Sequence, residues 1–177
     1  MFILYGVAAG IVVGLILGGR VDGLADLRIR LAWLAIAAFG VQVVLFLPGV
    51  GDALGAVAPA IYLASTLAIL GVMLANVRIP GVALMAAGAV CNLAAILANG
   101  GSMPASPGAA ASLGWTETAG YSNSIVRPDA ALAPLTDVFA LPAWLPFANV
   151  FSVGDVLIAV GLAIAVAAAM RRRTPAG

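Results

Sequence analysis

The stretch NVFSVGDVLIAVGLAIAVAAAMRRR, residues 149–173, places a long apolar run between an aspartate and three arginines. A run of roughly 17 to 25 apolar residues is enough for a helix to cross the hydrocarbon core of a membrane. Because lipid offers no hydrogen bonds to the backbone, such a segment must be helical. Asp155 stands at the start of this helix, where an ionised group is costly to place. We therefore expect it to be either a helix cap or a functional group.

The whole chain has the composition of a membrane protein. Of its 177 residues, 64% are hydrophobic and 8% are charged, whereas a soluble domain carries about 25% charged residues. The net charge of +1 argues against a nucleic-acid partner and leaves membrane lipid as the expected surroundings. The chain has no histidine and a single cysteine, Cys91. The sequence thus predicts no metal site and no cofactor, and it assigns Cys91 to packing.

Five apolar stretches are long enough to be membrane-spanning helices. They cover residues 2–18, 31–47, 53–75, 81–98 and 151–170. We predict an all-α fold, a polytopic membrane helix bundle with five transmembrane helices, in one integral membrane domain of residues 1–177. The first stretch has no basic residue before it and no convincing cleavage site after it, so we expect a retained helix and not a signal peptide.

The arginines predict how the bundle is oriented, because positively charged loops stay in the cytoplasm. Seven of the eight follow the first, third and fifth stretches: Arg20, Arg28, Arg30, Arg78, Arg171, Arg172 and Arg173. The eighth, Arg127, lies in the long link before the fifth stretch. This alternation predicts a multi-pass protein of the bacterial cell membrane, with its N-terminus outside and its C-terminus in the cytoplasm. Residues 99–150 then form a long extracytoplasmic loop, whose aromatic residues predict contact with the outer membrane surface.

The first stretch carries a glycine at every fourth position. These residues, Gly6, Gly10, Gly14 and Gly18, fall on one helical stripe and allow another backbone to approach closely. One interpretation is packing against the protein's own helices. The other is the seam of a homo-oligomer.

Three helices carry polar side chains at a similar depth in the outer half, judged from a rise of about 1.5 Å per residue. They are Gln42, Asn92 and Asp155. Polar groups inside membranes face the bundle interior and pair with one another, so we expect a pocket shared with Asp129 and Asp137. Further candidates to line this pocket are Asn99, Asn149 and Ser152. The alternative for Gln42 and Asn92 is hydrogen bonding that only joins helices.

Asp155 also has a purely structural interpretation. The pattern Ser-Val-Gly-Asp over residues 152–155 is typical of a helix start, in which Ser152 is the cap and Asp155 lies at the third helical position. The positive end of the helix dipole favours a carboxylate there. This role does not exclude a function, because an acid–base pair needs one ionised member.

Two resemblances accompany these patterns. The segments ANGGSMP, GYSNS and NVFSVGDVLIAVG resemble a family of small uncharacterised bacterial multi-pass membrane proteins over essentially the whole chain, which implies a class but no activity. Residues 129–170 resemble lipoprotein signal peptidase (signal peptidase II), a four-helix membrane aspartyl peptidase. FSVGD, residues 151–155, stands in the place of that family's phenylalanine-asparagine-x-alanine-aspartate motif, and Asp137 lies eighteen positions before Asp155.

The second resemblance implies that Asp137 and Asp155 are a catalytic pair. Two departures oppose it. Ser152 replaces the asparagine of the motif, and the residues around Asp129 lack the asparagine and the following arginine of the family's glycine-asparagine-x-x-aspartate-arginine motif.

Two classes of function remain open, and a small transporter is less favoured than either. The first is an intramembrane aspartyl hydrolase at the outer face, in which two carboxylates share a proton and activate water for attack on the peptide or ester carbonyl of a membrane-anchored substrate. We then expect Asp137 to hold the proton, since the helix dipole favours charge on Asp155. The second is a non-catalytic membrane scaffold, or a subunit of a larger complex, that binds a partner protein or lipid through its outer loop.

Overall fold

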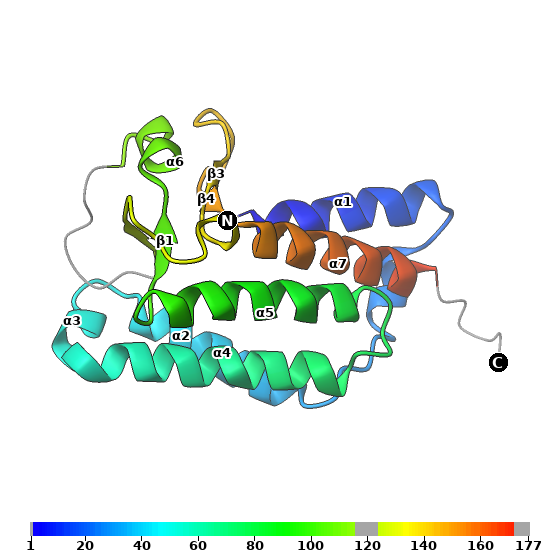
Figure 1. Cartoon of the computed structure of the whole chain (residues 1–177). Coiled ribbons are helices and arrows are strands. Elements are labelled where there is room, and N and C mark those ends of the chain that lie inside the picture. The colour runs from blue at the N-terminus through cyan, green and yellow to red at the C-terminus, as the bar shows by residue number, and fades with distance from the viewer. Residues whose placement is uncertain (1, 116–123, 172–177) are drawn as a thin grey trace.

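A computed structural model describes residues 2–115 and 124–171 of the chain, and it is mostly helical (Figure 1). The apolar helices are α1 (Ile3–Ile16), α2 (Ala32–Leu45), α4 (Ala58–Ala75), α5 (Val82–Ala98) and α7 (Val153–Met170). Each lies within one of the five apolar stretches, which confirms the prediction of a mainly helical fold. The short helices are η1 (Val21–Leu24), α3 (Val50–Leu54), η2 (Gly55–Val57), α6 (Pro107–Ser112) and η3 (Ala133–Leu135).

Two helical segments are long and apolar enough to cross a membrane, Val50–Ala75 and Val153–Met170. Helices α1, α2 and α5 have 14, 14 and 17 residues. Helices α1 and α2 fall below the roughly 17 residues that a spanning helix needs, and α5 lies at that lower limit. The predicted count of five spanning helices is therefore not confirmed. Helix α1 falls short because Gly18 adopts a left-handed conformation, with φ of 75°, which ends a helix.

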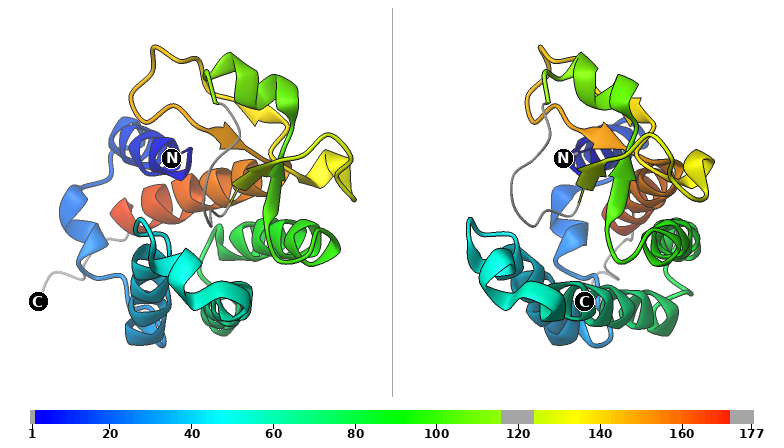
Figure 2. Two further views of the ribbon diagram at one scale, coloured as in Figure 1. Left: turned by 90° about the vertical axis from the view of Figure 1, so that its left-hand side faces the viewer. Right: turned by 60° about the vertical axis from the view of Figure 1, so that its left-hand side comes forward.

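The helices form a row in which each contacts the next, in the order α1, α7, α5, α4 and α2. The left view of Figure 2 looks along the bundle from one end and shows α7, in orange to red, between α1 in blue and α5 in green. Helix α7 therefore packs between two other helices, and α1 and α5 are the neighbours of groups along it.

Glycines allow α1 and α7 to pack closely. A Cβ atom at Gly6 would lie 2.5 Å from the carbonyl oxygen of Ala159, and one at Gly10 would lie 2.8 Å from that of Ala163. A Cβ atom at Gly14 would meet the side chain of Met170, with its sulfur 2.6 Å away. Three of the four glycines in the predicted stripe thus face a helix of the same chain. Gly18 has no atom of another element within 4 Å of such a Cβ position and serves as the helix end.

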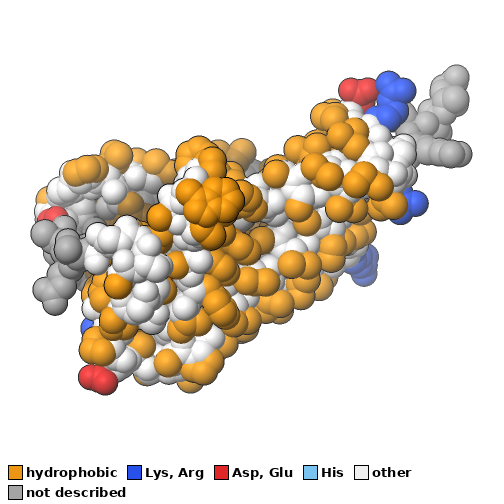
Figure 3. Space-filling view, turned by 90° about the horizontal axis from the view of Figure 1, so that it is seen from above, with side chains coloured by type: hydrophobic (Ala, Val, Ile, Leu, Met, Phe, Trp, Pro, Cys, Tyr) orange, Lys and Arg blue, Asp and Glu red, His pale blue; other side chains and the backbone are white. Residues whose placement is uncertain are grey.

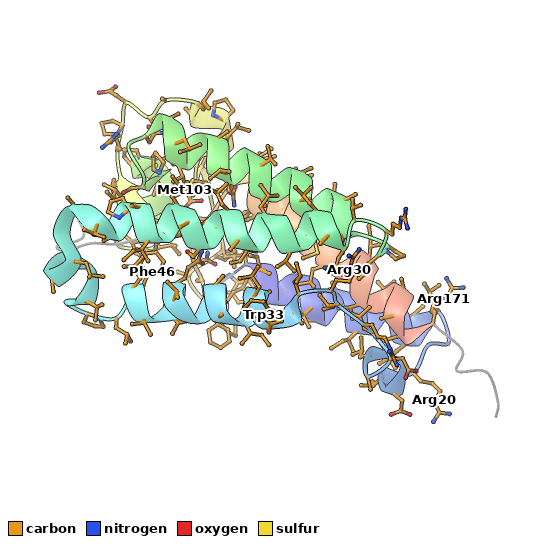
Figure 4. All side chains as sticks on the ribbon, turned by 90° about the horizontal axis from the view of Figure 1, so that it is seen from below. Arg20, Arg30, Trp33, Phe46, Met103 and Arg171 are labelled. Carbon is orange, nitrogen blue, oxygen red and sulfur yellow. The ribbon has the colours of Figure 1, made fainter. Side chains whose placement is uncertain are left out.

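The surface between the two ends of the bundle is apolar. Figure 3 shows hydrophobic side chains along its length and charged side chains at its ends. Large side chains on α2 are open to the surroundings, with Trp33 69% and Ile36 72% exposed. Figure 4 places Arg20, Arg30 and Arg171 at one end of the bundle. Arg172 and Arg173 lie outside the described residues. This distribution of side chains supports a membrane location.

Residues 99–152 are here called the outer segment, after the side of the membrane predicted for them. Their described part forms small ordered elements at the opposite end, where α5 finishes and α7 begins (Figure 1). The sequence did not predict its strands: β1 (Met103–Ala105), β2 (Ser124–Val126), β3 (Phe139–Ala140) and β4 (Val150–Phe151). Strands β1 and β2 pair in parallel, and β3 and β4 pair antiparallel. Most of the quoted GYSNS segment lies outside the described residues.

Candidate functional site

The strands of the outer segment bring Asp137 to the start of α7. Phe139 pairs with Phe151 in the antiparallel β3–β4 ladder, so the residues before Phe139 run alongside those that open the helix. On its other side, the backbone of Asp137 joins β1: its N–H donates to Pro104 O at 2.9 Å, and its carbonyl accepts from Ser106 N at 3.0 Å. Two sets of backbone contacts thus fix the position of this carboxyl group.

The side chain of Asp137 is buried, with 5% of the residue exposed. The Ser124 hydroxyl donates to its Oδ2 at 3.0 Å. Burial of the carboxyl, with a smaller contribution from the nearby charge of Asp155, raises the pKa of Asp137 from 3.8 to about 7, although the hydrogen bond from Ser124 opposes the rise. A group with this pKa both holds and releases a proton near neutral pH.

Asp155 closes a capping box at the start of α7, as the sequence pattern predicted. The Asp155 N–H donates to Ser152 Oγ at 3.0 Å, and the Ser152 N–H donates to Asp155 Oδ2 at 3.1 Å. These two bonds satisfy two amide groups that a helix start otherwise leaves without partners. Ser152 is fully buried, so the cap lies inside the protein and not at its surface.

Asn92 on α5 connects the cap to the neighbouring helix. Its Nδ2 donates to Asp155 Oδ1 at 2.9 Å, and its Oδ1 accepts from the Ser152 hydroxyl at 2.8 Å. Gly154 makes this contact possible, because a Cβ atom there would collide with the Asn92 amide. Both carboxylate oxygens of Asp155 therefore accept hydrogen bonds, and Asn92, Ser152 and Asp155 form one connected network.

The other residues predicted to line the pocket lie apart from this network. Gln42 Nε2 donates to Ser65 Oγ at 3.1 Å and to Thr66 Oγ1 at 3.2 Å, which joins α2 to α4. Similar depth did not bring Gln42 to Asp155 because α2 packs mainly against α4, whereas α7 packs mainly against α1 and α5. The helix-joining alternative thus describes Gln42.

The remaining candidates bind the backbone of the outer segment or face outward. Asn99 holds Ala131, donating to its carbonyl at 2.8 Å and accepting from its N–H at 2.9 Å. Asn149 donates to the Val150 carbonyl at 2.6 Å. Asp129 is exposed. Ser124, which binds Asp137, was not among the predicted site residues, since a serine in a loop carries no signal of its partner.

The site thus contains one buried carboxyl with a raised pKa, that of Asp137, and a second carboxyl, that of Asp155, which hydrogen bonds fix in position and whose charge contributes to the rise. Such a pair can donate and accept protons during hydrolysis. Among residues 2–115 and 124–171 no cluster of three or more His, Cys, Asp or Glu side chains could hold a metal ion.

Comparison with known proteins gives a family but no activity. No curated protein and no solved structure matches the chain, and no similarity to signal peptidase II is found. A family of unknown function, DUF5317, matches residues 26–167. The match includes Asn92, Asp137 and Asp155, and it begins after α1. Because it spans most of the sequence, the chain belongs to this family of unknown function.

Proposed function

We propose that this protein is an intramembrane aspartyl hydrolase that cleaves membrane-anchored peptides at the outer face of the bacterial cell membrane. The observation that carries the proposal is the buried carboxyl of Asp137, whose pKa is raised to about 7 by burial and by Asp155. The position of FSVGD at the start of α7, where signal peptidase II has its second aspartate motif, agrees with this chemistry.

In this proposal all five apolar helices cross the membrane. The shorter helices α1, α2 and α5 are accommodated by local thinning of the bilayer and by their flanking residues. The arginines at one end of the bundle lie in the cytoplasm. The outer segment and both aspartates then face outward, near the level of the lipid headgroups.

The reaction needs only the two carboxyl groups and a water molecule. Asp155 accepts a proton from the water as its oxygen attacks the peptide carbonyl carbon, while Asp137 gives its proton to the carbonyl oxygen. The resulting diol loses its C–N bond, and the nitrogen takes the proton from Asp155. Asp137 regains a proton from a diol hydroxyl, which leaves a carboxylic acid, an amine and the original pair. Asn92 and Ser152 hold Asp155 in position.

The test uses the full chain reconstituted in liposomes with a synthetic, membrane-anchored lipoprotein signal peptide. Mass spectrometry measures the cleaved peptide. We expect cleavage by the unmodified protein and none by Asp137→Asn or Asp155→Asn. Asp52→Asn is the matched control, because Asp52 is an exposed acid in α3 at the same end of the bundle. Absence of cleavage by the unmodified protein, or full activity in either site variant, contradicts the proposal.

A second candidate function is a non-catalytic membrane scaffold or subunit of a larger complex. The observation that favours it is the complete capping box, in which both oxygens of Asp155 already have donors. On this hypothesis Asp155→Asn retains the cap and lowers stability by at most about 1 kcal/mol, because asparagine also caps helices. Co-purification from crosslinked membranes of one stoichiometric partner, retained by Asp137→Asn and Asp155→Asn, supports it.

A further inference from the structure

A groove of about 370 Å³ runs between α1 and α7 on the outward surface of the bundle. Val13 and Leu17 of α1 form one wall, and Val160 and Ile164 of α7 form the other. The alanines of α7 that line it are less exposed than these wall residues; Ala167 is 7% exposed. Large side chains on both sides of small ones therefore make the groove narrow and apolar, at the place where the glycines of α1 bring the two helices together.

The length of the groove matches one leaflet of a bilayer. It extends along α7 from Val160 to Arg171, which is about 16 Å at 1.5 Å per residue. Half of a hydrocarbon core of about 30 Å is about 15 Å. The groove therefore has the length that an extended acyl chain covers in the leaflet on the arginine side.

The end of the groove carries a positive charge. Arg171 lines the groove and is exposed at the C-terminus of α7. Among residues 2–115 and 124–171, the only ion pair joins Arg20 to Asp22, so no described carboxylate neutralises Arg171. Arg20 lies at the same end (Figure 4), and its backbone N–H donates to the Met170 carbonyl at 2.8 Å. A guanidinium group presents a planar pair of donors that fits a phosphate.

From this combination we infer that the α1–α7 groove binds one acyl chain of an anionic phospholipid, whose phosphate is held by Arg171. The inference rests on the membrane placement of the chain and is independent of hydrolysis. An apolar groove one leaflet long fits the acyl chain, and Arg171, which no described carboxylate neutralises, fits the negative headgroup. The acyl chain of a zwitterionic lipid fits the same groove, but its headgroup compensates the positive charge of Arg171 less well.

The experiment measures lipid retention by native mass spectrometry. The full chain is reconstituted in nanodiscs of equimolar phosphatidylglycerol and phosphatidylcholine with the same acyl chains, then released and analysed. We expect preferential retention of one phosphatidylglycerol, and Arg171→Gln should reduce the preference about fivefold, the effect of one basic residue on an anionic lipid. Arg78→Gln is the matched control, since Arg78 is an exposed arginine in the turn before α5, away from the groove.

A second variant tests the groove independently of the charge. Val13→Phe narrows the groove from the α1 wall and should lower retention of both lipids, whereas Ile36→Phe, on the exposed face of α2, should not. Equal retention of the two lipids by the unmodified protein overturns the inference. So does an equal loss in Arg78→Gln and Arg171→Gln, which indicates a diffuse effect of charge. If inorganic phosphate displaces the phosphatidylglycerol and Val13→Phe retains as much lipid as the unmodified protein, Arg171 binds only a phosphate group and the groove holds no acyl chain. Failure to enter nanodiscs contradicts the membrane placement itself.

Discussion

Replacing Asp137 by asparagine should make the protein more stable above neutral pH. The pKa of Asp137 is about 7 in the folded protein and 3.8 in a solvated carboxyl. Below about pH 4 both the folded and the unfolded chain hold the proton. Between about pH 4 and pH 7 the folded protein keeps the proton and the unfolded chain loses it. Because the folded state binds more protons in this window, the free energy of unfolding falls as the pH rises.

The magnitude follows from the size of the pKa change. A rise of about three pH units, at about 1.4 kcal/mol for each, is on the order of 4 kcal/mol at pH 8. Asparagine has nearly the shape of aspartate and carries no charge, and its oxygen can still accept the hydrogen bond from Ser124. Asp137→Asn should therefore match the original protein near pH 4 and exceed it in stability by up to about 4 kcal/mol at pH 8.

The assay is unfolding in dodecylmaltoside micelles, followed by circular dichroism at pH 4, 5, 6, 7 and 8. The original protein should lose stability across this range, and Asp137→Asn should show a much flatter profile. Asp52→Asn is the control for general effects of charge, because Asp52 is exposed. Stability of the original protein that does not change with pH, or an Asp137→Asn profile parallel to the original, refutes the reasoning about burial.

Three further predictions concern the packing around the site. Gly10→Ala should lower stability by about 1–3 kcal/mol, because the new methyl group meets the Ala163 backbone at 2.8 Å. Gly40→Ala, which has open space around it, should be neutral or stabilising. Thermal melts of the two variants in the same micelles check this difference. Ser152→Ala should cost about 1–2 kcal/mol through loss of the cap, measured in the same way, with partial rescue by asparagine. Gln42→Leu should weaken the α2–α4 contact by about 0.6 kcal/mol per hydrogen bond, so a loss above about 3 kcal/mol in the unfolding assay speaks against this simple role.

The apolar helices were predictable because the sequence marks both their interiors and their ends. Helix α5 begins at Val82, one residue after the first residue of the predicted stretch, and it ends with that stretch at Ala98. The third stretch was predicted as one helix from residue 53, but Gly55 with a φ of 53° separates α3 from α4. An apolar run shows where a helix is favourable, and it does not show where a glycine uses its conformational freedom.

The neighbours of each side chain were less predictable than its depth. The rise per residue placed Gln42 and Asp155 at a similar level, and the row of helices then put them in different interfaces. The position of Asp137 depends on strands β3 and β4, each of two residues, which are too short to show the alternation that identifies a strand. The capping box was predictable because it depends only on residues close in sequence.

The two aspartates of the site are explained to different extents by structural roles alone. Asp155 has such a role, since the capping box and Asn92 use both of its oxygens. Asp137 has no structural role of comparable strength, since among the described residues only Ser124 binds its carboxylate. Its burial lowers the free energy of unfolding at neutral pH by a sizeable fraction of the total stability of a typical protein. An asparagine could keep the Ser124 contact without this penalty. A carboxyl that is buried at a cost, beside a second carboxylate, is typical of a group used for proton transfer. The proposed hydrolysis therefore depends mainly on Asp137, and Asp155 contributes its charge and its fixed position.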